Sequence, residues 1–169
     1  PDNQSIMEMI DKDWLPTWQD YNSYSEAADR GDAEAIRIQK VIASRIQNFV
    51  RYHIQDNSVY IGGKPEDKTK YETSKLNPEN NRFYSLEVTA NKNGMEVKDY
   101  LNVVHKVNMT NGLYNNTCSE YWIKKTGSNI RTQTRYLYAT SHAVVHQING
   151  VLLYDESQKT SWKEEAGIK

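Results

Sequence analysis

The feature that most constrains the fold is a change in hydrophobic period along the chain. Up to about residue 54, apolar residues recur every three or four positions, which is typical of amphipathic helices. From about residue 82 they alternate with polar residues, which is typical of strands with one buried face. We therefore expect an α+β fold in which N-terminal helices pack on a curved antiparallel sheet.

The clearest helix is predicted for residues 33–54, where apolar side chains form a single stripe. Ile38, Ile42 and Ile46 mark this stripe, and we expect it to lie on the sheet. The preceding residues 30–32, an Arg-Gly-Asp tripeptide, predict a turn followed by an N-cap at Asp32, because glycine often ends helices and aspartate often begins them.

Four large aromatic rings occur at helical spacing between residues 13 and 30. Steps of four, three and three residues separate them, so one helix would gather all four on one face. These residues are Trp14, Trp18, Tyr21 and Tyr24. The favoured interpretation is that the rings pack on the sheet, and the alternative is that they form a binding surface for another subunit.

Alternating residues predict a sheet of five or six mostly antiparallel strands in the second half of the chain. The predicted strands cover residues 58–61, a segment that starts near 82, and residues 95–109, 118–125, 130–148 and 151–154. Asn93-Gly94 and Asn149-Gly150 are typical hairpin turns, and the polar residues 64–80 are predicted as a loop or a short helix. Long strands twist and curl, so we expect a cone-like sheet with a helix in its hollow.

The length of 169 residues fits one domain with a single core. We expect a helical segment at 13–54, the sheet at 58–156 and a tail at 157–169 that Trp162 anchors. The single cysteine, Cys118, excludes an intrachain disulfide and a cysteine cage for a metal ion.

The composition bears on where the protein works. No apolar run is long enough to cross a bilayer. Because the chain starts at a proline, we expect that a signal or membrane anchor was removed upstream and that the full-length protein is extracytoplasmic. The many Asn, Lys, Tyr and Ile residues indicate A/T-rich codons, which favours a low-GC, Gram-positive-like bacterium.

The net charge of -1 is unevenly distributed. Residues 1–36 hold nine acidic and two basic side chains, a net charge of -7, and the rest of the chain has a net charge of +6. The basic residues are diluted over the sheet and form no cluster with aromatic residues, so nucleic-acid binding is not expected. The acidic segment either complements the mildly basic body or faces a partner protein.

Histidines on a predicted strand are the first candidates for chemistry. His142 and His146 are four residues apart and share one face, which His105 could approach from a neighbouring strand. Grouped imidazoles can bind zinc or exchange protons. Metal sites on strands more often use a spacing of two, and no carboxylate lies nearby in the sequence. We therefore predict no metal site and no cofactor, and interpret these histidines as the polar lining of a hollow.

Asp99 is the second candidate, because it is the one acidic residue on the predicted apolar face of its strand. An inward carboxylate with a raised pKa could act as a general base, with Tyr136, His142 and His146 completing a catalytic pocket. The favoured interpretation is that Asp99 lies exposed near the strand start. Serine-hydrolase, P-loop, dinucleotide-binding, EF-hand and zincin patterns are absent from the sequence.

The predicted order of elements over residues 13–156 is helices, then long strands, then a terminal hairpin at Asn149-Gly150. This order resembles the cystatin-like and nuclear-transport-factor-2-like cone folds. Within that group, the chain is similar to the extracytoplasmic domains of type IV secretion and conjugation scaffolds of the VirB class. This resemblance implies a curved sheet closed by N-terminal helices and a membrane anchor upstream. It also implies that catalytic residues are absent.

Two functions from different classes follow from these observations. The first is a non-enzymatic binding or assembly domain, an extracytoplasmic scaffold component that works with other protein subunits or with its own copies and meets the membrane only through an anchor. The second is a small-molecule-binding cone, a cofactor-free lyase or isomerase that uses Asp99, Tyr136, His142 and His146.

Overall fold

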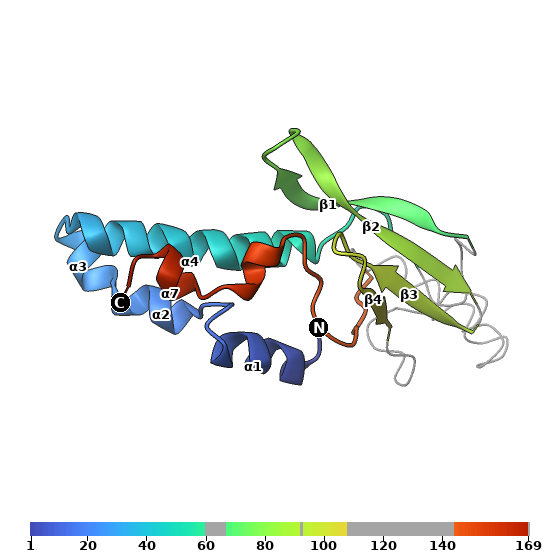
Figure 1. Ribbon diagram of the computed structural model, residues 1–169, viewed down its shortest axis with the longest axis horizontal. Coiled ribbons are helices and arrows are strands. Elements are labelled where there is room, and N and C mark those ends of the chain that lie inside the picture. The colour runs from blue at the N-terminus through green and yellow to red at the C-terminus, as the bar shows by residue number, and fades with distance from the viewer. Residues whose placement is uncertain (60–66, 92, 108–143, 169) are drawn as a thin grey trace, which may run out of the picture.

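Helices gather at one end of the molecule and an antiparallel sheet at the other (Figure 1). The computed structural model describes residues 1–59, 67–91, 93–107 and 144–168. The α+β class is confirmed. In this part of the chain the sheet is open and has four strands, so a fifth or sixth strand and a cone shape are not confirmed.

The helices come mainly from the first third of the chain. They are α1 (Asn3–Asp11), α2 (Trp18–Ser23), α3 (Ser25–Asp29), α4 (Ala33–Tyr52) and, near the C-terminus, the 3₁₀ helix η2 (Glu156–Lys159) and α7 (Trp162–Glu165). The start of α4 is as predicted, because the Asp32 carboxylate accepts hydrogen bonds from the N–H groups of Glu34 and Ala35. Gly31 before it has a positive φ of 87°, which favours glycine.

The prediction of one aromatic face over residues 13–30 was wrong. Thr17 and Asp20 form a capping box, in which each side chain accepts a hydrogen bond from the other residue's backbone N–H. This box starts α2 at Trp18, so Trp14 lies outside the helix. A second break, at Tyr24, then separates α2 from α3.

The buried side chains form two clusters, and α4 contributes to both. At the helical end, Ile38 and Ile42 of α4 pack with Trp162 and Ala166. At the sheet end, the α4 residue Tyr52 is fully buried in a cluster that includes the inward side chains of β2 and β3. Ten residues of helix separate Ile42 from Tyr52, which is about 15 Å. The long helix therefore runs from the helical end to the near edge of the sheet (Figure 1).

The expectation that this helix lies along the sheet was wrong. Its apolar stripe is covered by Tyr21 and Tyr24 and by the C-terminal Trp162, and only its last turn reaches the sheet core. The four aromatic candidates likewise do not pack on the sheet as a set. The expected anchoring of the C-terminal tail by Trp162 is confirmed, because its side chain is buried.

The sheet has the order β1-β2-β3-β4, and every neighbouring pair is antiparallel. The strands are β1 (Thr69–Asn77), β2 (Arg82–Asn91), β3 (Gly94–Lys98) and β4 (Val104–Lys106). The predicted β2 is confirmed, with Tyr84, Leu86 and Val88 buried. The β2–β3 hairpin is also confirmed, with Gly94 as the first residue of β3, paired with Asn91.

The prediction of a loop or short helix over residues 64–80 was wrong, because β1 occupies most of it. The more buried face of β1 carries mostly polar side chains, among them Thr73, which donates a hydrogen bond to the Tyr84 carbonyl oxygen at 2.9 Å. A strand with polar residues on both faces has no hydrophobic alternation. Its pairing with β2 therefore cannot be predicted from the spacing of apolar residues.

The predicted long strand at 95–109 is instead a hairpin of β3 and β4. The Asp99 N–H donates to the Val103 carbonyl oxygen, and the Val103 N–H donates to the Asp99 carboxylate. Asn102 adopts a left-handed φ of 66°, which asparagine tolerates well, and this closes the turn. Val97, Asp99 and Val103 are spaced as they would be on one face of a continuous strand, and the turn between them was therefore not predicted.

The predicted C-terminal strands differ too. Residues 144–147 form no strand, and Ile148 makes an isolated antiparallel bridge with Val107. Residues 151–154 were predicted as a strand but have no ladder partner among the described residues. The predicted strand at 118–125, residues 130–143 of the strand at 130–148, residues 60–61 of the strand at 58–61, and Cys118 lie outside the described residues.

Shortening a fully buried side chain of α4 tests the helical core. We predict that Ile42→Ala lowers the free energy of unfolding by about 3 kcal/mol, because the removed methyl groups leave a cavity. The matched control is Val50→Ala on the same helix, where the side chain is 47% exposed and the loss should be below about 1 kcal/mol. Urea unfolding of both variants measures the difference, and equal losses would contradict the described core.

Candidate functional site

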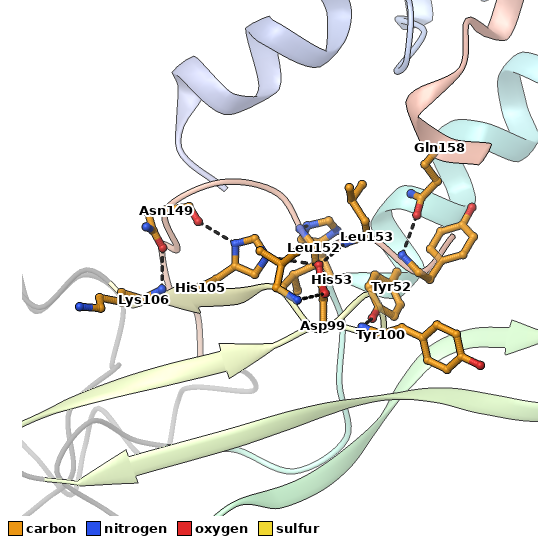
Figure 2. Close-up of polar contacts among 12 residues, drawn as sticks. Tyr52, His53, Asp99, Tyr100, His105, Lys106, Asn149, Leu152, Leu153 and Gln158 are labelled. Atoms are coloured by element: carbon orange, nitrogen blue, oxygen red, sulfur yellow. Dashed lines mark hydrogen bonds and ion pairs between the residues drawn. The ribbon is translucent and has the colours of Figure 1, made fainter. Parts of the chain in front are cut away.

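The C-terminal strap, residues 151–155, crosses the junction between α4 and the sheet without forming a strand. Three consecutive backbone N–H groups in it donate to side chains of other elements (Figure 2). Leu152 donates to His53 Nε2 at 3.2 Å, Leu153 to Asp99 Oδ2 at 3.1 Å and Tyr154 to Gln158 Oε1 at 2.7 Å. These side chains replace the hydrogen-bond partners that a neighbouring strand would supply.

Asp99 is buried, so the interpretation that it is exposed was wrong. Its side chain has no exposed area, and its oxygens accept from the N–H groups of Val103 and Leu153 and face His105 Nε2 at 3.3 Å. Burial alone would raise the pKa of Asp99, but the hydrogen bonds from His105, Leu153 and Val103 outweigh it and hold this pKa below its ordinary value. The raised pKa that the alternative interpretation attached to an inward Asp99 is therefore not found.

His105 on β4 completes a buried ion pair with Asp99. Its Nδ1 lies 2.8 Å from the Asn149 carbonyl oxygen and its Nε2 faces the Asp99 carboxylate. Both partners only accept hydrogen bonds, so both ring nitrogens are best satisfied when each carries a proton. Burial opposes the charge, but the bonds to Asp99 and Asn149 raise the pKa of His105 above its ordinary value.

Asn149 and Gly150 place the strap next to His105. The Asn149 N–H donates to the Lys106 carbonyl oxygen, and its side-chain oxygen accepts from the Lys106 N–H, which joins this turn to β4. Gly150 has a positive φ of 82°, and a Cβ there would lie 3.2 Å from His105 Nδ1. Glycine is required at this position by both its backbone conformation and the closeness of the imidazole.

His53, at the end of α4, is in the opposite protonation state. Its Nδ1 lies 2.8 Å from the Phe49 carbonyl oxygen, so that nitrogen carries the proton, while Nε2 accepts from Leu152. Burial lowers the pKa of His53 to about 4 and outweighs the bond to Phe49. The strap thus lies beside His53, whose hydrogen bonds need a neutral ring, and beside His105, whose hydrogen bonds favour a charged one.

Tyr52 precedes His53 and links the same junction to the β3–β4 turn. Its hydroxyl oxygen accepts a hydrogen bond from the Tyr100 N–H at 2.9 Å, and its ring meets those of Tyr84 and Tyr154 edge to face. Burial raises the pKa of Tyr52, and it raises that of Tyr154 to about 12. Both phenols therefore stay neutral at physiological pH and act as packing groups.

The second polar centre lies at the helical end. The Arg45 side chain donates from Nε to Glu165 at 2.6 Å and from Nη1 to the carbonyl oxygens of Trp14 and Thr160. It ties α4 to the α1–α2 connection and to α7. A pocket of about 110 Å³ opens beside it. Because this guanidinium is occupied by protein oxygens, it offers little to a ligand.

Of the other predicted catalytic residues, His146 is described and does not contact Asp99. His146 Nε2 donates to the Val59 carbonyl oxygen at 2.7 Å, and burial lowers the pKa of His146. Tyr136 and His142 lie outside the described residues. In the described part of the chain, no group of three or more His, Cys, Asp or Glu side chains is placed to hold a metal ion.

The four aromatic candidates divide by exposure. Tyr21 and Tyr24 pack against the helical core, and Trp14 is partly buried. Trp18 is 55% exposed, and its ring meets that of Tyr21 edge to face at 5.6 Å between centroids. Trp18 is thus the member of the set that is free to contact another protein.

Sequence reasoning did not identify His53 or Asn149 as site residues. His53 lies within the helix predicted for residues 33–54 and received no role of its own, and Asn149 was predicted only as a turn residue. A polar aromatic residue at the C-terminal end of a helix is a signal that could have been used, since helix ends often supply hydrogen bonds to the segment beyond them. Nothing in the sequence marks which backbone N–H groups these side chains bind.

Comparisons with known proteins do not extend this description. No protein-family model, no curated protein and no solved structure matches the chain. Among the helices of the described residues, none combines the length and the apolar character that a membrane span needs.

Removing the Asp99 carboxylate tests whether it supports the junction. We predict that Asp99→Ala lowers the free energy of unfolding by about 3 to 5 kcal/mol, because it leaves the buried His105 charge and two N–H groups without their acceptor. Glu87→Gln is the control, since that ion pair with Lys98 is at the surface and its loss should have little effect. Chemical unfolding compares them, and a stable Asp99→Ala protein would contradict the described role.

The raised pKa of His105 predicts a stability change on the alkaline side of neutrality. The stabilisation by its charge is complete below the unfolded-state pKa of about 6.5 and is lost as the pH rises through the higher folded-state value. His105→Gln should therefore remove part of the fall in unfolding free energy above about pH 6.5. His146→Gln should keep the fall, because the lowered pKa of His146 affects only acidic pH. Equal pH profiles for wild type and His105→Gln would contradict this.

Proposed function

We propose that this chain is a non-enzymatic protein-binding domain that assembles with other subunits through its helical end. We further propose that it is an extracytoplasmic scaffold component of a bacterial secretion or conjugation machine. The second proposal rests on the resemblance in element order, helices before an antiparallel sheet. The first rests on the surface charge of the helices.

The observation that carries the proposal is a set of exposed acidic side chains at the helical end, of which two are paired locally, Glu26 with Arg30 at 2.6 Å and Glu34 with Arg37 at 3.9 Å. Six of the nine acidic residues in 1–36 are exposed, and they are Glu8, Asp11, Glu26, Asp29, Asp32 and Glu34. One ion pair of the described residues, Asp13 to Lys163 at 2.8 Å, joins this segment to the C-terminal part of the chain. Of the two interpretations of the acidic segment, the arrangement therefore favours the one in which it faces a partner.

Trp18, in the same acidic segment, supplies an exposed apolar side chain. Tryptophan is enriched among the residues that dominate binding energy, because it buries a large area with few rotatable bonds. Its edge-to-face contact with Tyr21 orients the ring while more than half of its surface stays exposed. The fitting partner is a protein with a pocket for an aromatic ring and a rim of lysines or arginines.

The alternative, a lyase or isomerase, has less support. A general base must contact the substrate proton, whereas the Asp99 carboxylate is enclosed and occupied by protein donors. His146 is bonded to a different element, the Val59 backbone. The enzymatic hypothesis then depends on Tyr136 and His142, which lie outside the described residues.

A photo-crosslinking residue placed beside Trp18 in the source cell tests the proposal. We expect one or a few proteins with basic surfaces to be crosslinked, and Trp18→Ala to weaken binding of the purified partner about 30-fold. High salt should also weaken binding, because the acidic residues contribute. Phe83→Ala is the matched control, since Phe83 is 49% exposed at the sheet end and should be neutral.

Two results would contradict this proposal. One is a protein that sediments as a monomer at low salt and crosslinks to nothing through position 18. The other is a partner whose affinity depends on Phe83 and not on Trp18. A second copy of this chain as the crosslinked protein would support assembly through self-association.

A further inference from the structure

The hydrogen bonds of His53 require a neutral ring. Its Nδ1 proton is committed to the Phe49 carbonyl oxygen, which can only accept, and the lone pair on Nε2 accepts from the Leu152 N–H. A second proton on the ring can be added only at Nε2. That proton would point at the Leu152 N–H, so two donors would face each other and the hydrogen bond would be lost.

The neighbours of His53 do not compensate for such a charge. The titratable groups around the ring are Tyr52 of α4, the Asp99 and His105 pair of β3 and β4, and the amino group of Pro1. Positive charge on His105 or on the amino group opposes a positive charge on His53, and Tyr52 is neutral. The Asp99 carboxylate is already paired with His105.

We propose that His53 is an acid-sensitive latch that holds the C-terminal strap on the α4–sheet junction and releases it when the ring is protonated. This regulatory device does not depend on the proposed function. The release exposes Leu152, which is buried in the closed state. It leaves α7 attached, because Arg45 binds Glu165 and Thr160, and the Trp162 N–H donates to the Asp13 carbonyl oxygen.

A second titratable group that binds the strap is the Asp99 carboxylate, and it takes up a proton only at lower pH. The Leu153 N–H is held by Asp99, whose pKa lies below its ordinary value of about 4. Protonation of His105 does not release the strap, because both of its ring nitrogens face acceptors, the Asp99 carboxylate and the Asn149 carbonyl oxygen. Between neutrality and about pH 5, the titration of His53 is therefore the one that acts on the strap.

Amide hydrogen exchange of the intact chain, read at single residues by NMR and corrected for the intrinsic pH dependence, tests the latch. With a pKa of about 4 in the closed state and about 6.5 in the open state, opening at Leu152 should be about 20-fold more frequent at about pH 5 than at about pH 7. The amide of Ala166 in the same sample should change by less than about twofold, because α7 stays attached.

His53→Gln separates the latch from general acid sensitivity. A glutamine oxygen can accept from the Leu152 N–H but has no proton to gain, so this variant should lose the pH dependence of Leu152 exchange. His146→Gln is the matched control, because it removes another partly buried neutral histidine and should keep that dependence.

The proposal is overturned if Leu152 exchange in the unmodified protein does not accelerate in acid, or if His53→Gln accelerates equally. NMR titration of the His53 ring in the wild-type chain gives a second test that does not need a folded variant. A ring pKa near 6.5, or a proton on Nε2 at neutral pH, would also overturn the proposal.

Discussion

The junction between α4 and the sheet depends on side chains that accept hydrogen bonds from the strap. Without His53, Asp99 and Gln158, three consecutive buried or half-buried N–H groups would have no partner, at a cost of about 1 to 3 kcal/mol each. The carboxylate contributes most, because it also closes the β3–β4 turn and pairs with His105. One acidic residue thus connects the sheet, the turn and the C-terminal strap.

The same arrangement gives the two ends of the molecule a second connection besides α4. The helical core around Ile42 and the sheet core around Tyr52 are separate clusters, and α4 connects them. The strap gives a second connection, from β4 through Asn149 to η2 and α7. Arg45 of α4 holds the C-terminal end of this connection by hydrogen bonds to Glu165 and Thr160. Two parallel connections resist relative movement better than a single helix.

The parts of the fold that could be predicted are those with a strong apolar period. The helix at 33–54, its Asp32 cap and the strand from Arg82 fall in this class, because burial of one face determines both period and structure. The strand β1 could not be predicted, since its inward face is polar and β2 supplies its partner. The β3–β4 turn could not be predicted either, because Asp99 and Val103 continued the alternation of a strand.

The candidate site shows the same division. Asp99 was identified as an acidic residue on a predicted apolar face and His105 as a histidine that could approach other histidines, and the structure instead joins Asp99 and His105 as an ion pair. Their role could not be read from the sequence, because it depends on which backbone N–H groups approach them. The charge asymmetry, in contrast, is a property of the sequence alone, and the fold leaves most of its acidic members exposed.

The most direct test of this account is the scalar coupling between two nitrogen nuclei across the hydrogen bond from Leu152 N–H to His53 Nε2. In a uniformly ¹⁵N-labelled sample at neutral pH, we expect a resolvable coupling between these two nuclei, together with the chemical shift of an unprotonated Nε2. A sample in which His53 Nε2 carries the proton, or in which Leu152 shows no coupling to it, would contradict the claim that side chains hold the strap in place.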